Sequence, residues 1–332
     1  MMAGPHVRAD VPTFGTLPPR TVRLADCSLT GATRPLPGVT HHYVHANGLR
    51  FHAAEAGTHG PPVLLLHGFP QHCYAWRHVM ADLAADHRVY ALDLRGAGQS
   101  EAPRRGYDSA TLASDVLAVL DALGLPVVQL VGHEWGGWLG FTVALAAPER
   151  FSSFVAVNTP HPWLPHRKLL PQMWRYWYTA LLEYPMLGAW VIRTRPGVLR
   201  WLLRRDRPGL PDADVNVFVE VARQPARAHA GQQLHWQIVL RDIPRQAFGA
   251  SRRHHLTVPT LLLAGSHDFA LSPRSLTEAG RHADELRVRV LDGGHYLPEE
   301  RPDQVADAAR ELTQRSAVAT SDSTGAVIIA SQ

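Results

Sequence analysis

The stretch LVGHEWGGW, residues 130–138, decides the fold. It is typical of a strand end, a sharp glycine-rich turn and a helix start, with one acid, Glu134, at the tip of the turn. Glycine is needed in such a turn because the crossing strand and helix leave no room for Cβ atoms. We therefore expect Glu134 to project from the carboxyl end of a sheet, above a helix N-terminus whose backbone N–H groups stabilise an anion.

Two competing motifs fail at this turn and near it. A zinc-protease HExxH motif would need histidine at position 137, where the sequence has Gly137. The stretch RGAGQS (95–100) lacks the third glycine of a dinucleotide-binding loop. Glu134 is then a carboxylate nucleophile or an ordinary acid at a helix N-terminus, and the glycine spacing favours the nucleophile.

Apolar runs on both sides of the turn predict an α/β fold. Runs of buried-strand type alternate with helix-sized patterns around 76–85, 109–123 and 136–148, and Asn47-Gly48 predicts a hairpin turn. The strand-like runs are 62–68, 88–94, 127–132, 153–158, 260–265 and 287–294. Val/Leu-rich strands joined by helices predict a mostly parallel sheet, here of eight strands, with helices on both faces.

The alternation stops at residue 160 and resumes near residue 248, and the intervening 160–247 is helix-like and rich in Trp and Arg. A basic, Trp-bearing amphipathic segment can lie on a membrane, but such residues more often pack a helical lid onto a core, which is the interpretation we prefer. The predicted divisions are an N-terminal arm (1–37), a core (38–159 and 248–315), a helical cap (160–247) and a flexible tail (316–332).

Composition limits the classes of protein. The chain has 332 residues, 45% hydrophobic and 19% charged, and a formal net charge of +4. Two cysteines, Cys27 and Cys73, form no CxxC pair, and no apolar run approaches the ~18 residues of a membrane span. We expect a soluble cytoplasmic protein with no metal, no nucleic-acid partner and no membrane partner.

A histidine and a second acid follow the last two strand-like runs. Asp268 comes just beyond 260–265, and His295 comes just beyond 287–294. A nucleophile, an acid and a base in this order converge at the carboxyl edge of such a sheet. The predicted oxyanion hole consists of the backbone N–H groups of Phe69 and Trp135.

Five motifs in register resemble the α/β-hydrolase superfamily, in its epoxide hydrolase and haloalkane dehalogenase branch. They are HGFP, DLRGAGQSEAP, GHEWGGW, GSHDFALSP and GGHYLPEERP, and the resemblance covers about residues 40–315. The resemblance implies a cofactor-independent hydrolase that acts on a small apolar molecule; we expect a monomer or a homodimer. Glu134 would attack carbon to form an ester, and water activated by His295 and Asp268 would hydrolyse that ester.

The chain departs from this family at two kinds of position. In this branch the turn between strand and helix reads G-H-D-W-G-G, so Glu134 stands where an aspartate is usual. The additional methylene group of glutamate moves the carboxylate by about 1 Å, and a misplacement of that size can cost ~10²-fold in rate. Epoxide hydrolases of this branch resemble one another in having two lid tyrosines that donate hydrogen bonds to the epoxide oxygen. Tyr178 fits the first position, with Tyr176 as a substitute. The second falls near Gln237, where no tyrosine stands, and His235, Trp236 or Gln237 are the candidate replacements.

Other functions remain open at this point. Trp135 matches the halide-binding tryptophan of haloalkane dehalogenases, whereas HGFP is closer to epoxide hydrolases and to dehalogenases of haloacids. Glu134 could also act as a general base in an esterase or a cyclase, or the fold could bind an apolar ligand without turnover. Epoxide opening through a glutamyl ester is the leading hypothesis.

Overall fold

An eight-stranded sheet forms the centre of the protein. The computed structural model describes residues 37–164, 166–207, 209–276 and 279–324. The strand order is β1-β2-β4-β3-β5-β6-β7-β8; β2 runs antiparallel to β1 and β4, and the pairs from β4 to β8 are parallel. The strands are β1 (Thr40–Ala46), β2 (Leu49–Ala56), β3 (Pro62–Leu66), β4 (Arg88–Leu92), β5 (Val128–His133), β6 (Phe151–Val157), β7 (Thr260–Gly265) and β8 (Leu286–Leu291).

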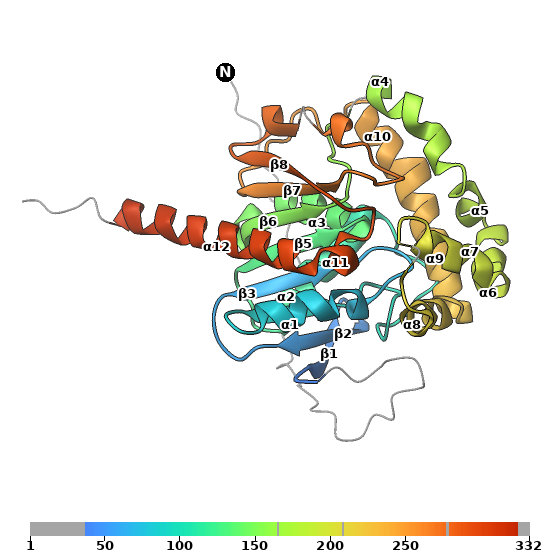
Figure 1. Cartoon of the computed structure of the whole chain (residues 1–332), viewed down its shortest axis with the longest axis horizontal. Coiled ribbons are helices and arrows are strands. Elements are labelled where there is room, and N and C mark those ends of the chain that lie inside the picture. The colour runs from blue at the N-terminus through green and yellow to red at the C-terminus, as the bar shows by residue number, and fades with distance from the viewer. Residues whose placement is uncertain (1–36, 165, 208, 277–278, 325–332) are drawn as a thin grey trace, which may run out of the picture.

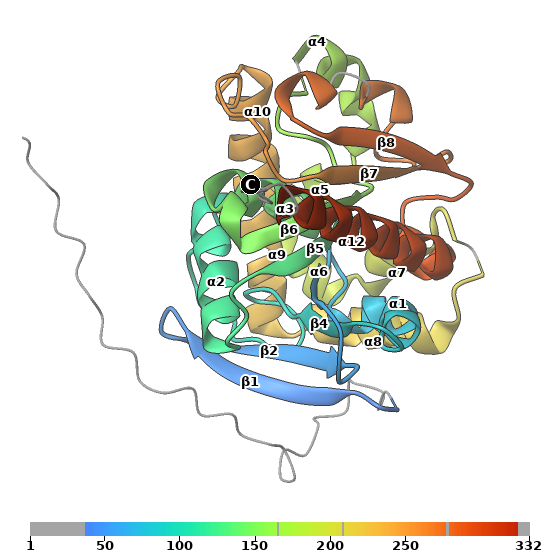
Figure 2. The same ribbon diagram turned by 90° about the vertical axis from the view of Figure 1, so that its left-hand side faces the viewer.

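Helices cover both faces of the sheet (Figures 1 and 2). Because strand side chains alternate, Leu64 and Leu66 of β3 pack with α2 and α3, whereas Val63 and Leu65 pack with α1 and α12 on the other face. These helices and the short α11 are α1 (Arg77–Leu83), α2 (Ser109–Ala122), α3 (Trp135–Ala146), α11 (Leu297–Glu300) and α12 (Pro302–Thr324). The predicted α/β-hydrolase architecture is confirmed.

A helical segment lies in the chain between β6 and β7, and Figure 1 shows it on the right of the sheet. Its buried Leu182, Ile192 and Phe218 pack with Phe269 and Tyr296 from the loops that follow β7 and β8. This packing fixes the segment over that edge of the sheet. Its helices are α4 (His166–Leu169), α5 (Ala180–Glu183), α6 (Leu187–Thr194), α7 (Pro196–Arg204), α8 (Asp212–Ala222), α9 (Pro225–Gln237) and α10 (Ile243–Ala247), with a π-helical turn, η4 (Ile238–Asp242), after α9.

Local structure follows the sequence at the first hairpin and departs from it at the last strand and the last helix. The hairpin at Asn47-Gly48 is confirmed, since β1 and β2 pair up to Ala46 and Leu49. The strand predicted at 287–294 is β8, but it is an edge strand and not a buried one, with Val290 51% exposed. The helix α12 continues to Thr324, within the predicted tail 316–332, and the rest of that tail lies outside the described residues. The arm lies outside the described residues, apart from residue 37.

Four tryptophans of the helical segment do not follow the prediction. Trp174, Trp177, Trp190 and Trp201 are 69%, 58%, 48% and 39% exposed, so the expectation that they pack a lid onto the core is wrong for them, whereas Trp163 is buried against Phe141 as expected. The buried residues of this segment are instead mostly Leu, Val and Ile. Within the described residues, the structure contains no helix with the length and apolar character that a membrane crossing requires.

Candidate active site

The turn between β5 and α3 holds Glu134 in a strained conformation. Glu134 has φ 54° and ψ −118°, in the region that L-residues other than glycine rarely occupy. A Cβ atom at Gly136 would lie 2.2 Å from the carbonyl oxygen of Leu66, and one at Gly132 would lie 2.5 Å from the carbonyl oxygen of Gly136. Only glycine fits at these two positions, so the tight turn expected from the sequence is present.

Two backbone N–H groups hold the Glu134 carboxylate. The amides of Phe69 and Trp135 donate to its Oε2 at 2.9 and 2.8 Å, and Trp135 also begins α3. Within the described part of the chain, Oε1 accepts no hydrogen bond. Burial raises the pKa of Glu134 to about 7, although the charge of His295 and the two backbone donors act in the opposite direction. One oxygen is therefore fixed and the other is available.

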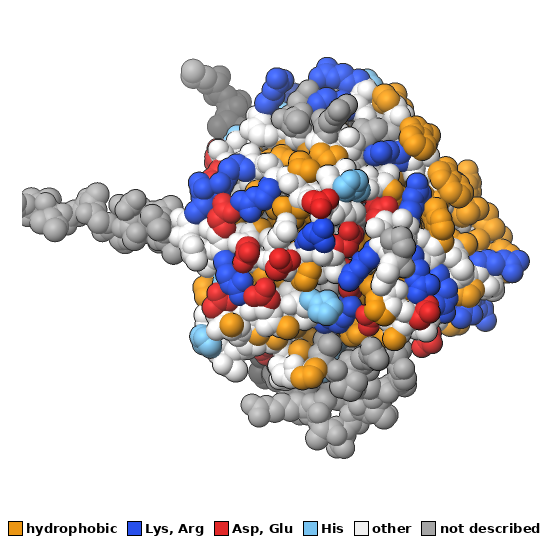
Figure 3. All heavy atoms as spheres, viewed as in Figure 1, with side chains coloured by type: hydrophobic (Ala, Val, Ile, Leu, Met, Phe, Trp, Pro, Cys, Tyr) orange, Lys and Arg blue, Asp and Glu red, His pale blue; other side chains and the backbone are white. Residues whose placement is uncertain are grey.

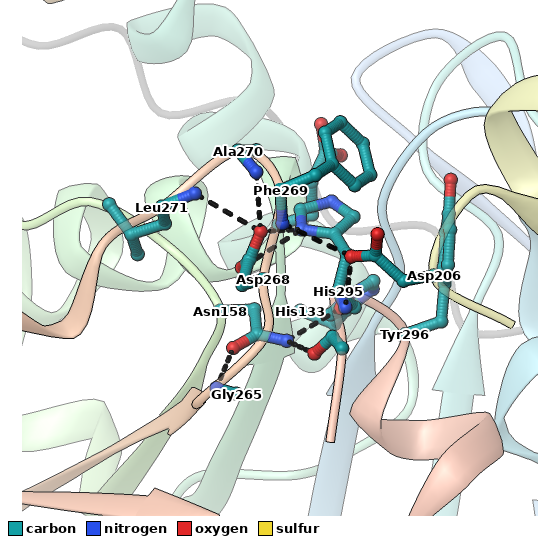
Figure 4. Close-up of polar contacts among 12 residues, drawn as sticks. His133, Asn158, Asp206, Gly265, Asp268, Phe269, Ala270, Leu271, His295 and Tyr296 are labelled. Carbon is teal, nitrogen blue, oxygen red and sulfur yellow. Dashed lines mark hydrogen bonds and ion pairs between the residues drawn. The ribbon is translucent and has the colours of Figure 1, made fainter. Parts of the chain in front are cut away.

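Asp268 and His295 meet where the sequence places them, beyond β7 and β8 (Figure 4). The Nδ1 atom of His295 lies 3.1 Å from each Asp268 carboxylate oxygen. Asp268 Oδ1 also accepts the backbone N–H groups of Ala270 and Leu271, at 2.7 and 3.1 Å. Because a carboxylate only accepts, Nδ1 carries a proton, and Nε2 is the atom that acts as the base whenever the ring is neutral.

The electrostatics of His295 depend on several acids. Burial alone would lower the pKa of His295, but the charges of Asp268, Glu134 and Asp206 outweigh burial and raise it to about 9. The imidazole is therefore protonated in the free protein at neutral pH. The positive charge of His295 in turn lowers the pKa of Glu134, so the two groups stabilise each other's ionised forms.

Three residues that the sequence analysis did not single out fix the His295 loop. Asn158 donates through Nδ2 to the carbonyl oxygens of Gly294 and His295 at 2.8 and 2.6 Å, and its Oδ1 accepts the N–H of Gly265 at 2.7 Å. His133 donates through Nε2 to the same His295 carbonyl at 2.8 Å. The position of Asn158 directly after β6 was a usable signal, since polar residues after strand ends cluster at one edge of such a sheet.

Asp206 is the third of these residues, and it comes from the helical segment just after α7. Its Oδ2 accepts the backbone N–H groups of His295 and Phe269, at 3.0 and 3.1 Å (Figure 4). The contact joins the helical segment to both loops that carry Asp268 and His295. No motif in the sequence marks Asp206 for this position.

A cavity of about 40 Å³ lies above Glu134 and His295. Tyr176, Tyr178 and His235 from the helical segment line it from the opposite side. A second cavity of about 360 Å³ shares Trp135 and Tyr176 with the first. The larger cavity is therefore next to the small one, and only the small one borders the Glu134 carboxylate.

Trp236 and Gln237 do not line this cavity, contrary to their predicted placement. Successive residues of a helix point about 100° apart, so when His235 on α9 faces the cavity its two successors face elsewhere. Gln237 borders a separate surface hollow beside Asp108 and Arg245. Of the three candidate replacements for a second lid tyrosine, the structure leaves His235.

The hydrogen bonding of His235 determines what it offers to the cavity. Its Nδ1 donates to the carbonyl oxygen of Gly231 at 2.7 Å, and burial lowers its pKa to about 4. The ring is therefore neutral at ordinary pH and its Nε2 is an acceptor. Its edge packs against Phe69 and Trp135, with ring centroids 4.6 and 5.8 Å away.

Tyr176 and Tyr178 are the phenols that the helical segment contributes to the cavity wall, which also includes Tyr296 from the loop after β8. Burial raises the pKa of both, and the charge of Glu134 is the next largest influence on Tyr178. Both phenols therefore stay protonated at neutral pH. Among the described residues, neither hydroxyl has a hydrogen-bond partner, so both protons are available to a bound molecule.

A buried cluster of His52, Cys73 and Asp93 has the residue types of a metal site, with ligand atoms within 4.8 Å of one another. Asp93 is already occupied by hydrogen bonds, however. It accepts from His52 Nδ1 and the Cys73 N–H, each at 2.7 Å, and from the Gln99 N–H at 2.8 Å. These bonds tie the loop after β4 to β2, which is a structural role.

Comparison with known proteins places the chain. Residues 61–302 match the family described as alpha/beta hydrolase fold. Epoxide hydrolase 4 of Mus musculus is 31% identical, over 92% of this chain and 88% of that protein, and a soluble epoxide hydrolase of Corynebacterium sp. strain C12 is 29% identical, over 82% and 96%. The crystal structure of Cfl2 from Burkholderia cenocepacia aligns with a TM-score of 0.76 at 27% identity, over 84% and 97% of the two chains. The chain therefore belongs to the α/β-hydrolase fold family, as an epoxide-hydrolase-like member of it.

Proposed function

We propose that the protein hydrolyses epoxides through a glutamyl ester formed on Glu134. The observation that carries this proposal is the pair of backbone N–H groups, from Phe69 and Trp135, on a single oxygen of the carboxylate. They hold Oε2 in place and leave Oε1 to attack a carbon atom in the cavity. The glutamate thus fills the place of the aspartate usual in this branch, despite its additional methylene group.

Ring opening joins Oε1 of Glu134 to an epoxide carbon and breaks the bond from that carbon to the ring oxygen. The ring oxygen develops negative charge and takes the phenol proton of Tyr178. Tyr178 suits this step because it is buried in the cavity wall and is protonated at neutral pH. The product of the step is an ester between Glu134 and a hydroxyalkyl group.

Hydrolysis of the ester regenerates the carboxylate. His295 removes a proton from water through Nε2 while Asp268 holds Nδ1, and the water oxygen attacks the ester carbonyl carbon. Oε2 then carries the negative charge between the N–H groups of Phe69 and Trp135. Collapse releases the diol, and the two protons of the consumed water end on the leaving oxygen and on Tyr178.

The charges of the site favour this order of steps. In the free protein the charge of Glu134 contributes to the raised pKa of His295. Ester formation removes that charge, so the pKa of His295 falls and the neutral imidazole becomes available as a base. Formation of the ester therefore converts His295 to the neutral form that ester hydrolysis requires.

A single turnover in water labelled with ¹⁸O tests the proposal. Enzyme in excess over an epoxide should yield an unlabelled diol, because the oxygen that enters the diol comes from Glu134, and the label should appear in the peptide that contains Glu134. Mass spectrometry of the diol and of the digested protein measures both. Label in the diol with none in the peptide would reject the ester and indicate direct attack by water.

Dehalogenation is the second candidate. The indole Nε1 of Trp135 is buried and has no partner among the described residues, and Trp135 lines the cavity beside Glu134. Such a donor could stabilise a departing halide while Glu134 forms the same kind of ester. Release of halide from haloalkanes or haloacids, measured beside epoxide hydrolysis, separates the two functions.

A further inference from the structure

The outer surface of the helical segment is unusually apolar. The described part of the chain exposes fourteen large hydrophobic side chains, and nine of them lie between Leu170 and Trp201. We call these nine the outer apolar face; among them are Trp174, Tyr184 and Met186, which are 69%, 56% and 85% exposed. Figure 3 shows hydrophobic side chains gathered along the right-hand edge, over α5 and α6. Patches of this kind mark interaction sites.

Basic side chains accompany the outer apolar face. Residues 160–205 contain one acidic residue, Glu183, and it is buried at 5% exposure. The basic residues of the same stretch are Arg167, Lys168, Arg175, Arg193, Arg195, Arg200, Arg204 and Arg205. A surface that pairs apolar side chains with one sign of charge fits a partner that is apolar inside and anionic at its boundary.

Tryptophan and arginine are also in direct contact on this face. The guanidinium carbon lies over an indole ring in three pairs, at centroid distances of 5.9, 4.8 and 5.0 Å. The pairs are Arg175 with Trp174, Arg195 with Trp190, and Arg205 with Trp201; the Arg205 guanidinium also lies over buried Phe269, at 4.5 Å, so it is the least outward of the three. Trp at the boundary between hydrocarbon and water, with Arg at the level of the headgroups, is typical of interfacial membrane binding.

The larger cavity lies between this face and the small cavity at Glu134, with which it shares wall residues that include Trp135 and Tyr176. Its volume is about 360 Å³, and its wall includes Trp177, Ala180 and Leu240. These three are exposed, whereas Trp135 in the same wall is buried next to Glu134. Trp177 therefore belongs both to the wall of this cavity and to the outer apolar face.

We propose that the outer apolar face docks on a lipid bilayer with anionic headgroups, and that lipophilic substrates enter the cavity from the bilayer beside Trp177. The charge favours this occupant over a second copy of the chain, since a two-fold contact through this face would bring its arginines together. The proposal departs from the expectation of no membrane partner, which assumed that the tryptophans pack inward.

Vesicle binding of the full chain tests the proposal. The protein should sediment with phosphatidylglycerol vesicles, less with phosphatidylcholine vesicles, and less with either at high salt. The double variant Trp174→Ser/Trp190→Ser should lose roughly tenfold or more in partitioning, because two large apolar side chains no longer leave water. Val290→Ser, at an exposed apolar site on β8, is the matched control and should bind as the wild type does. Thermal melting checks that each variant is folded.

The measurement needs no substrate, so its outcome is independent of the proposed epoxide chemistry. Failure of the wild type to sediment with phosphatidylglycerol vesicles would overturn the docking proposal, and so would wild-type binding by the folded double variant. Sedimentation velocity identifies the remaining occupant. A wild-type dimer that the double variant converts to monomer, with no vesicle binding, would assign the face to self-association instead.

Discussion

The two walls of the small cavity are built on different principles. Its floor is formed by Glu134 and His295 at the carboxyl edge of the sheet, where backbone N–H groups hold the Glu134 carboxylate and the Asp268 carboxylate holds the His295 ring. Its roof is formed by Tyr176, Tyr178 and His235 on the helical segment, where packing of helices decides the direction of each side chain. The floor therefore has a geometry set by the sheet, whereas the roof can change with small changes in packing. We expect the floor to carry most of the rate enhancement.

Asp268→Asn should lower the rate of ester hydrolysis by roughly 10³- to 10⁴-fold, the largest effect that we expect from a single substitution at the cavity. The N–H groups of Ala270 and Leu271 would retain the amide oxygen, so the amide NH₂ would face Nδ1 of His295. Nδ1 must then accept, the proton moves to Nε2, and the base is lost. Loss of the carboxylate charge also lowers the pKa of His295. Rapid-quench measurement of ester decay reads the effect.

Asp206→Asn is the control for this change, because Asp206 contacts the backbone N–H of His295 and not its imidazole. We expect a loss of less than about tenfold, since an amide oxygen can still accept that bond. Equal impairment of the two variants would mean that the Asp268 contact does not determine the tautomer of His295. The geometry of the floor would then depend less on specific hydrogen bonds than we propose.

The same contrast explains what the sequence could predict. Glu134, Asp268 and His295 were predictable because each follows a strand, and parallel strands bring their carboxyl ends to one edge. Asp206 was not, because its loop reaches His295 only after the helices have packed.

The helical segment was harder to predict for a physical reason. Three consecutive residues, 235–237, were candidates for the roof, and only the rotation of α9 shows that His235 is the one that lines the cavity. An amphipathic pattern in the sequence also does not determine whether the apolar side of a helix packs on the core of the same chain or on another molecule. Trp174 and Trp190 were therefore expected to pack inward, and they face outward.

Tyr178→Phe tests the roof and should lower the rate of ester formation from epoxides by roughly 10²-fold, because one donor to the developing alkoxide is lost. Tyr176→Phe is the matched control and should cost less, because the charge of Glu134 affects Tyr178 more directly than Tyr176. Stopped-flow alkylation rates separate this step from ester hydrolysis, which should be unchanged. A slower hydrolysis step with unchanged alkylation would remove Tyr178 from the role of donor.

His235→Phe should have the smallest effect, within about threefold in the rate of ester formation. The neutral ring donates through Nδ1 to Gly231 and presents only a lone pair at Nε2, so it cannot stabilise an alkoxide. Phenylalanine preserves the edge contacts with Phe69 and Trp135, and loss of the bond to Gly231 should lower the free energy of unfolding by about 1 kcal/mol. Alkylation rates and chemical denaturation measure the two effects. A loss as large as that for Tyr178→Phe would mean that His235 donates to the substrate, in the place where the family uses its second lid tyrosine.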